Sequence, residues 1–273
     1  MSEASGPLPL AGQSALVTGG GSGIGLRSAQ LLVRDGASVT ICGRSEERLE
    51  EGLATLRSAI PAGSSATVTS VPCDVAKEDD VIAAVEAAKA NGGGALTMAV
   101  AAAGTGAGGP IVMTTLDAWR HVMSVNLDGA FLTVKHAGAA IAASGGGSIV
   151  GISSIAAPLT HRLMAAYCVS KAGLEALVRN AADEMGAQNV RVNAVRPGLV
   201  PTDIAAGLTT NDAIVGDYLD QMPIRRLGTV DDVAHGVRYL CGPESSWVTG
   251  QCFAIDGGHT LRRGPDLTVG FAR

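Results

Sequence analysis

The chain has 273 residues, 47% of them hydrophobic and 16% charged, with a formal net charge of -5 at pH 7. This composition excludes general disorder, and without an excess of basic residues nucleic acid is not expected as a partner. No run approaches the roughly 18 apolar residues of a membrane-spanning helix, and the five scattered cysteines suit neither a disulfide framework nor a zinc site, so a cytoplasmic protein without a metal or a membrane partner is expected.

Short β-branched runs alternate with longer amphipathic stretches along the whole chain. Strands are predicted at 15–18, 38–42, 67–71, 96–101, 148–153, 190–195 and 252–255, and helices at 24–35, 45–60, 78–90, 116–143, 165–185 and 230–240. Because strands separated by helices run parallel, the expected fold is one α/β domain, a doubly wound sheet of seven parallel strands with helices on both faces. Residues 1–10 are expected to be a flexible tail, 11–259 the domain, and 260–273 a C-terminal extension.

The first strand leads into a glycine-rich turn, Thr18-Gly19-Gly20-Gly21-Ser22-Gly23-Ile24-Gly25, and then into a helix. Such glycines permit a tight turn and let a pyrophosphate approach bare backbone, while the helix N-terminus attracts its negative charge. A plain flexible turn is the alternative, which the flanking strand and helix disfavour. No Gly-Lys-Ser/Thr follows, which excludes a P-loop kinase or NTPase. The candidate cofactor-binding residues here are Gly19, Gly21, Ser22, Gly23 and Ile24.

The second strand ends at Cys42-Gly43-Arg44, where a dinucleotide fold places the residue that meets the adenosine ribose. A carboxylate there would accept from the 2'-hydroxyl, whereas Arg44 suits a 2'-phosphate by charge and by its fork of donors. The sequence therefore favours NADP(H) over NAD(H). In the alternative, NAD(H) is used and Arg44 is a solvated residue paired with a carboxylate such as Glu47.

Tyr167 and Lys171 are four residues apart at the start of a predicted helix, so both long side chains lie on one helix face. An ammonium beside a phenol favours the phenolate and prepares the tyrosine for acid or base work. Ser154 ends the fifth strand, at the edge of the sheet where ligands of such folds bind. A YxxxK spacing arises often by chance, but the glycine turn and Ser154 in this order strengthen the interpretation.

These features together resemble the short-chain dehydrogenase/reductase family, in its branch of single-domain enzymes of roughly 250 residues, from Ala11 to Gly258. The resemblance rests on the TGxxxGIG turn, on Ser154 thirteen residues before Tyr167, and on Lys171. Further matching positions are Asp74-Val75, Asn126, Pro197-Gly198 with Thr202, and Asp256-Gly257-Gly258. The family usually has Asn-Asn-Ala-Gly after the fourth strand, where this chain has Ala101-Ala102-Ala103-Gly104, so the contacts of that loop, Gly104 included, are expected to be made by its backbone.

The resemblance implies a Rossmann-like oxidoreductase that interconverts a carbonyl and an alcohol by hydride transfer. Ser154 would donate to the carbonyl oxygen, Tyr167 would deliver the proton, and Lys171 would hold the cofactor ribose and lower the Tyr167 pKa. Asn126 would position a water of the proton relay. The implied cofactor contacts of Asp74 and Val75 are with the adenine, and that of Thr202 is with the nicotinamide carboxamide. A cofactor-binding sensor without chemistry and a sugar-nucleotide epimerase are the rivals, disfavoured by the intact Ser-Tyr-Lys set and by the lack of a second substrate domain.

Residues 203–226 mix apolar and acidic side chains, which predicts a mobile lid over the site and a small apolar carbonyl or alcohol substrate. His161 is the one histidine expected near the substrate. Arg225, Arg226, Arg262 and Arg263 are expected to be solvated, and become candidates for an anionic substrate only if they face the cleft. The Ala-rich stretches 116–143 and 165–185 resemble the helices that pack family members into homo-oligomers, either tetramers or dimers.

Overall fold

Every strand pair in the structure is parallel, and the strands form a single sheet in the order β3-β2-β1-β4-β5-β6-β7. The computed structural model describes residues 8–261. The strands are β1 (Ser14–Thr18), β2 (Ser38–Gly43), β3 (Val68–Pro72), β4 (Met98–Ala101), β5 (Gly147–Ile152), β6 (Val190–Pro197) and β7 (Cys252–Ile255). All seven predicted strands are present, within a few residues of their expected ends.

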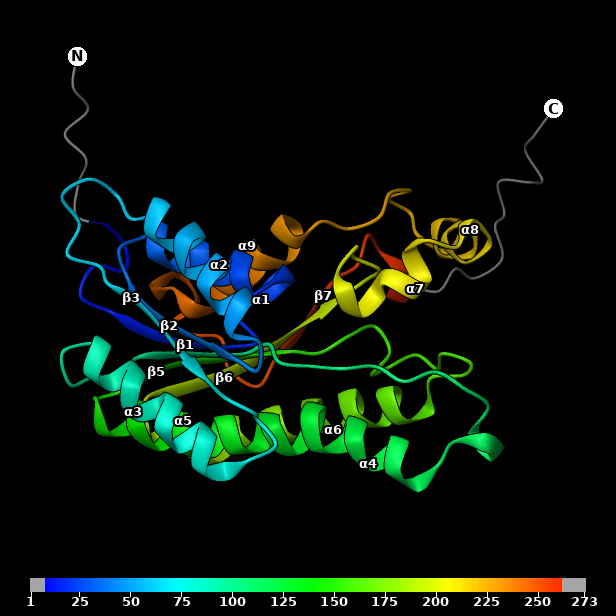
Figure 1. Ribbon diagram of the computed structural model, residues 1–273, viewed down its shortest axis with the longest axis horizontal. Helices are drawn as coiled ribbons and strands as arrows, with labels where there is room; N and C mark the ends of the chain where they lie inside the picture. The colour runs from blue at the N-terminus through cyan, green and yellow to red at the C-terminus, as the bar shows by residue number, and fades with distance from the viewer. Residues whose placement is uncertain (1–7, 262–273) are drawn as a thin grey trace, which may run out of the picture.

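Helices cover both faces of this sheet (Figure 1). One face carries α1 (Gly23–Arg34), α2 (Glu46–Ser58) and α9 (Val230–Cys241), and the other carries α3 (Glu78–Asn91), α4 (Leu116–Met123), α5 (Gly129–Ala143) and α6 (Ala165–Met185). Two clusters of buried apolar side chains fill the spaces between the sheet and its helices. The predicted doubly wound, Rossmann-like fold is therefore confirmed.

The local sequence explains why the strand β1 is buried and where the helices α2 and α9 begin. All five residues of β1 are buried, as a central parallel strand requires. The Ser45 hydroxyl accepts from the backbone N–H of Arg48 at the start of α2, and Thr229 forms a capping box with Asp232 at the start of α9. These caps satisfy N–H groups that a helix N-terminus leaves without partners.

The predicted helix 116–143 is continuous but not uniform. Between α4 and α5, residues Ser124–Asp128 form a π-helical turn, and the candidate residue Asn126 lies in it. A π turn often marks a functional position, because it redirects the side chains and carbonyls of one helical turn. Sequence periodicity predicts the helix but not this local widening.

The predicted lid is helical. It contains a 3-10 turn at Asp203–Ala205 and the helices α7 (Ala206–Thr209) and α8 (Asp212–Gln221), which project beyond the end of the sheet (Figure 1). At the other end, Leu10 is buried and donates its N–H to the Asp35 carbonyl, so residues 8–10 of the expected tail pack against the domain. The rest of that tail, residues 1–7, and most of the expected extension, residues 262–273, lie outside the described residues. Within 8–261 we find no helix that combines the length and the apolar character needed to cross a bilayer.

The strand order reverses between β1 and β4, because the chain builds the sheet outward from β1 in one direction and from β4 in the other. Ligands of open α/β sheets bind in the crevice at such a point, beyond the carboxyl ends of the strands. Here the crevice lies between the glycine turn after β1 and the Ala102–Gly104 segment after β4. An ideal Cβ on Gly19 would lie 2.8 Å from the Ala103 Cα, so only glycine permits this close approach.

Candidate active site

A cleft follows the carboxyl ends of the strands on both sides of the crevice. Its empty volume is about 870 Å³, the open mouth included. The described residues that line it include Gly19, Gly21, Ser22, Gly43, Arg44, Ser45, Arg48, Asp74, Val75 and Gly104. The structure thus brings seven of the predicted cofactor residues together, from four separate segments of the chain.

The glycine turn forms a cradle of bare backbone at the bottom of this cleft. Gly19 and Gly23 have φ values of +63° and +53°, a conformation that side-chain-bearing residues rarely adopt. An ideal Cβ on Gly21 would lie 3.2 Å from the Arg48 carbonyl oxygen, so a side chain there would crowd the first turn of α2. The turn opens directly into the N-terminus of α1, where backbone N–H groups favour an anion. These residues fit a dinucleotide.

Two arginines border the adenosine end of the cleft. Arg44 is exposed and, within residues 8–261, takes part in no ion pair, so the expected alternative of a Glu47 partner is wrong. Arg48, one turn into α2, instead pairs with Asp203 of the lid at 2.7 Å. Sequence reasoning missed Arg48, because nothing local to α2 indicates that its side chain reaches across the cleft to a segment 155 positions later.

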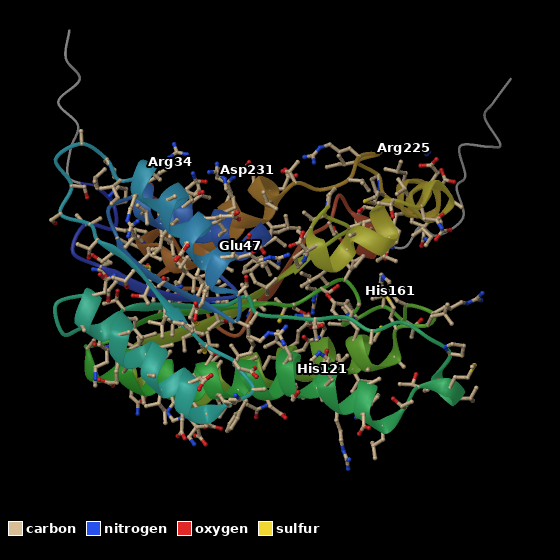
Figure 2. The ribbon with its side chains drawn as sticks, in the orientation of Figure 1. Arg34, Glu47, His121, His161, Arg225 and Asp231 are labelled. Carbon is tan, nitrogen blue, oxygen red and sulfur yellow. The ribbon has the colours of Figure 1, made fainter. Side chains whose placement is uncertain are left out.

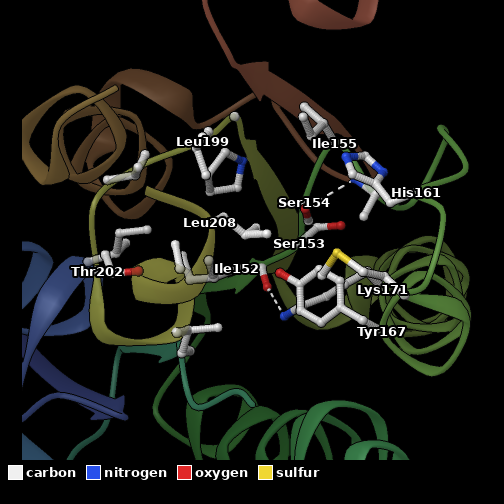
Figure 3. A pocket seen from close by; sticks show the side chains of 18 of the residues that line it. Ile152, Ser153, Ser154, Ile155, His161, Tyr167, Lys171, Leu199, Thr202 and Leu208 are labelled. Atoms are coloured by element: carbon white, nitrogen blue, oxygen red, sulfur yellow. Dashed lines mark hydrogen bonds between the residues drawn. The ribbon is translucent and has the colours of Figure 1, made fainter. Parts of the chain in front are cut away.

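Ser154, Tyr167 and Lys171 meet in a second cavity, which adjoins the first at the end of β5 (Figure 3). Tyr167 and Lys171 lie on adjacent turns of α6, and the Lys171 Nζ is 5.6 Å from the centroid of the Tyr167 ring. That ammonium donates to the Ile152 carbonyl oxygen at 2.7 Å, at the end of β5. The Ser154 hydroxyl and the Tyr167 phenol both line this cavity, and Ser154 lies near enough to lower the pKa of the phenol. The three predicted residues therefore share one pocket.

The ionisation of this cluster differs from expectation. Burial lowers the pKa of Lys171 from 10.5 to about 8, because no carboxylate compensates for its lost hydration. Burial raises the pKa of Tyr167 above its ordinary value, and the nearby Ser154 hydroxyl opposes this shift only in part. The net lowering of the Tyr167 pKa that was expected from Lys171 is therefore not seen, because desolvation of the phenol is the largest cause of its shift.

Asn126 hydrogen-bonds both to the loop after β4 and to the helix α6. Its Oδ1 accepts from the Thr105 N–H at 2.8 Å, and its Nδ2 donates to the Thr105 carbonyl and to the Ser170 hydroxyl at 2.9 Å and 3.0 Å. Both amide hydrogens are therefore used within the protein. Asn126 holds Thr105 beside Gly104, which lines the cofactor cleft and is also near Lys171.

A buried ion pair supports the residue next to Ser154. The Glu175 carboxylate accepts two hydrogen bonds from Arg196, both at 2.6 Å, and a third from the Ser153 hydroxyl at 2.8 Å. This arrangement joins β6 to α6 and to the end of β5, the two elements that carry the cluster. Sequence reasoning did not identify it, because its three members are far apart in the chain.

The lid and the loop after β6 close the other side of the second cavity. Pro197, Gly198, Thr202 and Ile24 line it together, as the cofactor predictions require. An ideal Cβ on Gly23 would lie 3.4 Å from the Thr202 Cγ2, so the glycine turn and the start of the lid are in close contact. Asp256 accepts from the backbone N–H groups of Gly258 and Thr260 at 2.9 Å and 2.8 Å, which orders the segment behind this loop.

The far wall of the second cavity contains residues that were not all expected. His161 lines it, as predicted, between the lid and the layer of α4 and α6 (Figure 2). Tyr218 of α8 also lines it, and its ring centroid is 6.2 Å from that of His161. Arg225 and Arg226 do not line this cavity and pair with Asp220 and Asp232 at 2.7 Å. Arg262 and Arg263 lie outside the described residues.

Comparison with known proteins agrees with this geometry. Residues 19–260 match the family model described as "Enoyl-(Acyl carrier protein) reductase". The chain therefore belongs to the short-chain dehydrogenase/reductase family and is an enzyme of the dehydrogenase/reductase type. Its relatives include the 2-(S)-hydroxypropyl-CoM dehydrogenase 3 of Xanthobacter autotrophicus, which is 36% identical over 89% of this chain and 95% of its own length.

Solved structures add the cofactor class. A short-chain dehydrogenase/reductase from Mycobacterium ulcerans has a TM-score of 0.89 and 42% identity over 96% of this chain and 95% of its own. A gluconate 5-dehydrogenase from Burkholderia cenocepacia, solved with NADP and tartrate, has a TM-score of 0.87 and 29% identity over 94% and 98% of the two chains. A 7α-hydroxysteroid dehydrogenase was solved with NADH and 7-oxo glycochenodeoxycholic acid, with a TM-score of 0.86 and 30% identity over 92% and 96%. Family neighbours thus bind either nicotinamide dinucleotide.

Proposed function

We propose that this chain is an NADP(H)-dependent oxidoreductase that interconverts a carbonyl and an alcohol, with Tyr167 as its general acid and base. The observation that supports this most directly is the convergence of Ser154, Tyr167 and Lys171 in a cavity that adjoins the glycine cradle. An acid, a hydrogen-bond donor and a cation in one partly enclosed pocket are what carbonyl reduction requires.

A bound nicotinamide supplies or accepts the hydride in this chemistry. The chain's own residues handle the oxygen atom and the proton. Ser154 donates a hydrogen bond to the carbonyl oxygen and so holds it against Tyr167, whose hydroxyl hands over its proton as negative charge develops on that oxygen. In alcohol oxidation the phenolate removes the hydroxyl proton instead.

The ionisation of the pocket favours reduction near neutral pH. Because burial raises the Tyr167 pKa, the phenol stays protonated there and is ready to act as an acid. Alcohol oxidation needs the phenolate and is expected to accelerate as the pH rises. Lys171, with a pKa of about 8, carries its charge below that pH and stabilises the phenolate after proton transfer.

Tyr167→Phe tests the reaction. Removal of the phenolic proton is expected to lower turnover of a ketone panel by about 100- to 10,000-fold, the range of a general acid, while leaving cofactor affinity within about twofold. Cofactor absorbance measures the first quantity and fluorescence titration the second. The rival function, a cofactor-binding sensor, predicts that wild-type enzyme and variant are equally inactive with every ketone and alcohol.

The preference for NADP(H) is supported by the position of Arg44. Its guanidinium borders the adenosine end of the cleft without a carboxylate partner among residues 8–261, so it is available to a 2'-phosphate. Arg44→Ala is expected to weaken NADPH binding by about 10- to 100-fold, the value of a charged hydrogen bond, and to leave NADH binding within about twofold. Arg57→Ala, at the far end of α2, is the matched control. An unchanged NADPH to NADH ratio in Arg44→Ala would assign the preference elsewhere.

The remaining cofactor contacts belong to the same proposal. Asp74 and Val75 are assigned to the adenine, and Pro197, Gly198 and Thr202 to the nicotinamide. Asn126 is assigned to the water of the proton relay and also to positioning the loop that carries Gly104. A cytoplasmic location stays a prediction, as does a homo-oligomer. Phe131 of α5 and Val169 of α6 support the latter, because they are 47% and 46% exposed on the two helices expected to pack between subunits. Light scattering of the full chain measures its mass.

A further inference from the structure

The cavity that holds Tyr167 is apolar around its reactive end. Its empty volume is about 690 Å³, the open mouth included, and part of this space belongs to the nicotinamide under the proposed function. The apolar side chains of the wall include Ile155, Ala156, Met164, Leu199, Val200 and Leu208. The part of the cavity left for a substrate, called the substrate compartment below, is therefore bordered mainly by apolar side chains.

Aromatic rings form the outer wall of this compartment. The Tyr218 ring of α8 lies between the rings of His161 and His259, with centroid distances of 6.2 Å and 5.3 Å and interplanar angles of 38° and 60°. Burial and the nearby Tyr167 raise the pKa of Tyr218, so its phenol stays neutral. A rigid ring with one polar tip offers a packing surface at a small cost in side-chain entropy.

The described lining of the compartment contains no arginine and no lysine besides Lys171, and its only other basic side chain is the His161 imidazole. Among the described residues that line it, Lys171 is the only Lys, Arg, Asp or Glu, and its ammonium already donates to the Ile152 carbonyl. Arg225 lies on the outer side of the lid, away from His161 (Figure 2), and pairs with Asp220. A carboxylate entering the compartment would lose its hydration without gaining an ion pair.

Resting on the proposed function, we propose that the substrate is a compact, uncharged cyclic ketone or the corresponding secondary alcohol, whose ring packs between Tyr218 and Leu208 while its oxygen meets Ser154 and Tyr167. Carboxylate-bearing analogues are excluded by the missing counter-ion. Gluconate and tartrate carry carboxylates, so a site for either molecule would need a cationic side chain to pair with that charge. The described lining of this compartment offers no such side chain besides the engaged Lys171.

Matched ring ketones test the assignment. 4-Methylcyclohexanone and 4-oxocyclohexanecarboxylate have the same ring and differ in one substituent, an uncharged methyl against a charged and larger carboxylate. 4-Isopropylcyclohexanone, whose branched substituent is uncharged and closer in size to the carboxylate, controls for size. At pH 8, kcat/KM with NADPH is expected to be at least about 100-fold higher for the neutral ketone, as an unpaired buried charge implies. Equal or better turnover of the carboxylate overturns the proposal. So does turnover of open-chain ketones with neither ring ketone accepted.

A binding experiment distinguishes a failure of the proposed substrate class from a failure of the proposed reaction. Calorimetric titration of both ketones into Tyr167→Phe loaded with NADPH measures affinity without turnover, and the neutral ring is expected to bind at least about tenfold more tightly. If neither ring binds, or the carboxylate binds as well, the substrate class is wrong. If the neutral ring binds but wild-type enzyme reduces no carbonyl compound, the proposed reaction is wrong and the substrate class stands.

Two variants test the residues that carry the argument. Leu208→Arg places a cation in the wall and is expected to raise kcat/KM for 4-oxocyclohexanecarboxylate by about tenfold or more. Val112→Arg is the control, because it adds the same charge at a position that is 90% exposed and outside the cavity, and it is expected to give no such gain.

Tyr218→Ala is expected to raise the KM for 4-methylcyclohexanone by about tenfold and the KM for acetone by less than threefold. Tyr218→Phe keeps the ring and is expected to leave both KM values unchanged. Equal responses in each pair overturn the assigned wall.

Discussion

Lys171 is a buried ammonium that the protein maintains at a cost, and the size of this cost follows from its pKa. The side chain is 5% exposed and has no carboxylate partner, and its pKa is lowered from 10.5 to about 8. The difference corresponds to about 3 kcal/mol, since each pKa unit is about 1.4 kcal/mol. Lys171→Met keeps the length and apolar stem of the side chain but removes the charge, so it removes this cost.

The sign and the pH window are determined by linkage. The unfolded chain binds more protons at this site than the folded chain between the folded pKa of about 8 and the unfolded value of 10.5, so wild-type stability rises with pH in that window. Below pH 8 the cost is fully present, and above 10.5 it vanishes. Most of this cost is expected to disappear between pH 7 and pH 10.

The measurement is urea unfolding of wild-type chain and Lys171→Met without cofactor, at intervals from pH 7 to pH 10. The free energy of unfolding of the variant minus that of the wild type is expected to fall by about 2–3 kcal/mol across this range. Loss of the hydrogen bond to the Ile152 carbonyl adds an offset of about 1–3 kcal/mol that does not depend on pH, so the slope is diagnostic. Lys89→Met, on the surface of α3, controls for removal of one positive charge. A stability difference between variant and wild type that does not change with pH would show that Lys171 is hydrated and that the buried-charge argument is wrong.

Three further substitutions probe the scaffold of the site. Gly19→Ala is expected to lower the free energy of unfolding by about 1–3 kcal/mol and to weaken NADPH binding, because φ is +63° and the new Cβ has no room. NADPH binding equal to that of the wild type would contradict the proposal that this turn holds the dinucleotide. Asn126→Ala leaves the Thr105 N–H and carbonyl without their partner and is expected to cost about 2 kcal/mol, with faster amide exchange at Thr105. Arg196→Met leaves the buried Glu175 carboxylate unpaired and is expected to lower the free energy of unfolding by about 3–5 kcal/mol. Changing Glu175 to Met as well is expected to restore most of this stability. A double variant as unstable as the single one would refute the pairing argument.

The pattern of the chain was sufficient to predict every strand of the sheet and the candidate cluster. Parallel strands buried on both faces favour apolar runs such as residues 15–17 of β1, and helix starts depend on nearby residues such as Ser45 and Thr229. Tyr167 and Lys171 are one turn apart on a single helix, so their proximity is a local property. Ser154 joined them in the prediction because parallel strands end at a common edge.

Other features depend on segments far apart in the chain. Arg48 reaches Asp203, and Glu175 joins Arg196 to Ser153, through contacts that no local pattern encodes. The direction of the Tyr167 pKa shift is of this kind too. The sequence shows which cation lies nearby, but only packing determines how much water the phenol loses.

The order of apolar runs, glycines and caps therefore determined the architecture and the chemical groups of the site, because those depend on backbone geometry and on neighbours within one or two turns. Tertiary structure decided the environment of those groups: the hydration of Tyr167 and Lys171, the aromatic wall that Tyr218 forms with His161, and the lack of a free cation in the described lining. Burial and charge balance are sums over atoms contributed by the whole fold, so they exist only once the chain has packed.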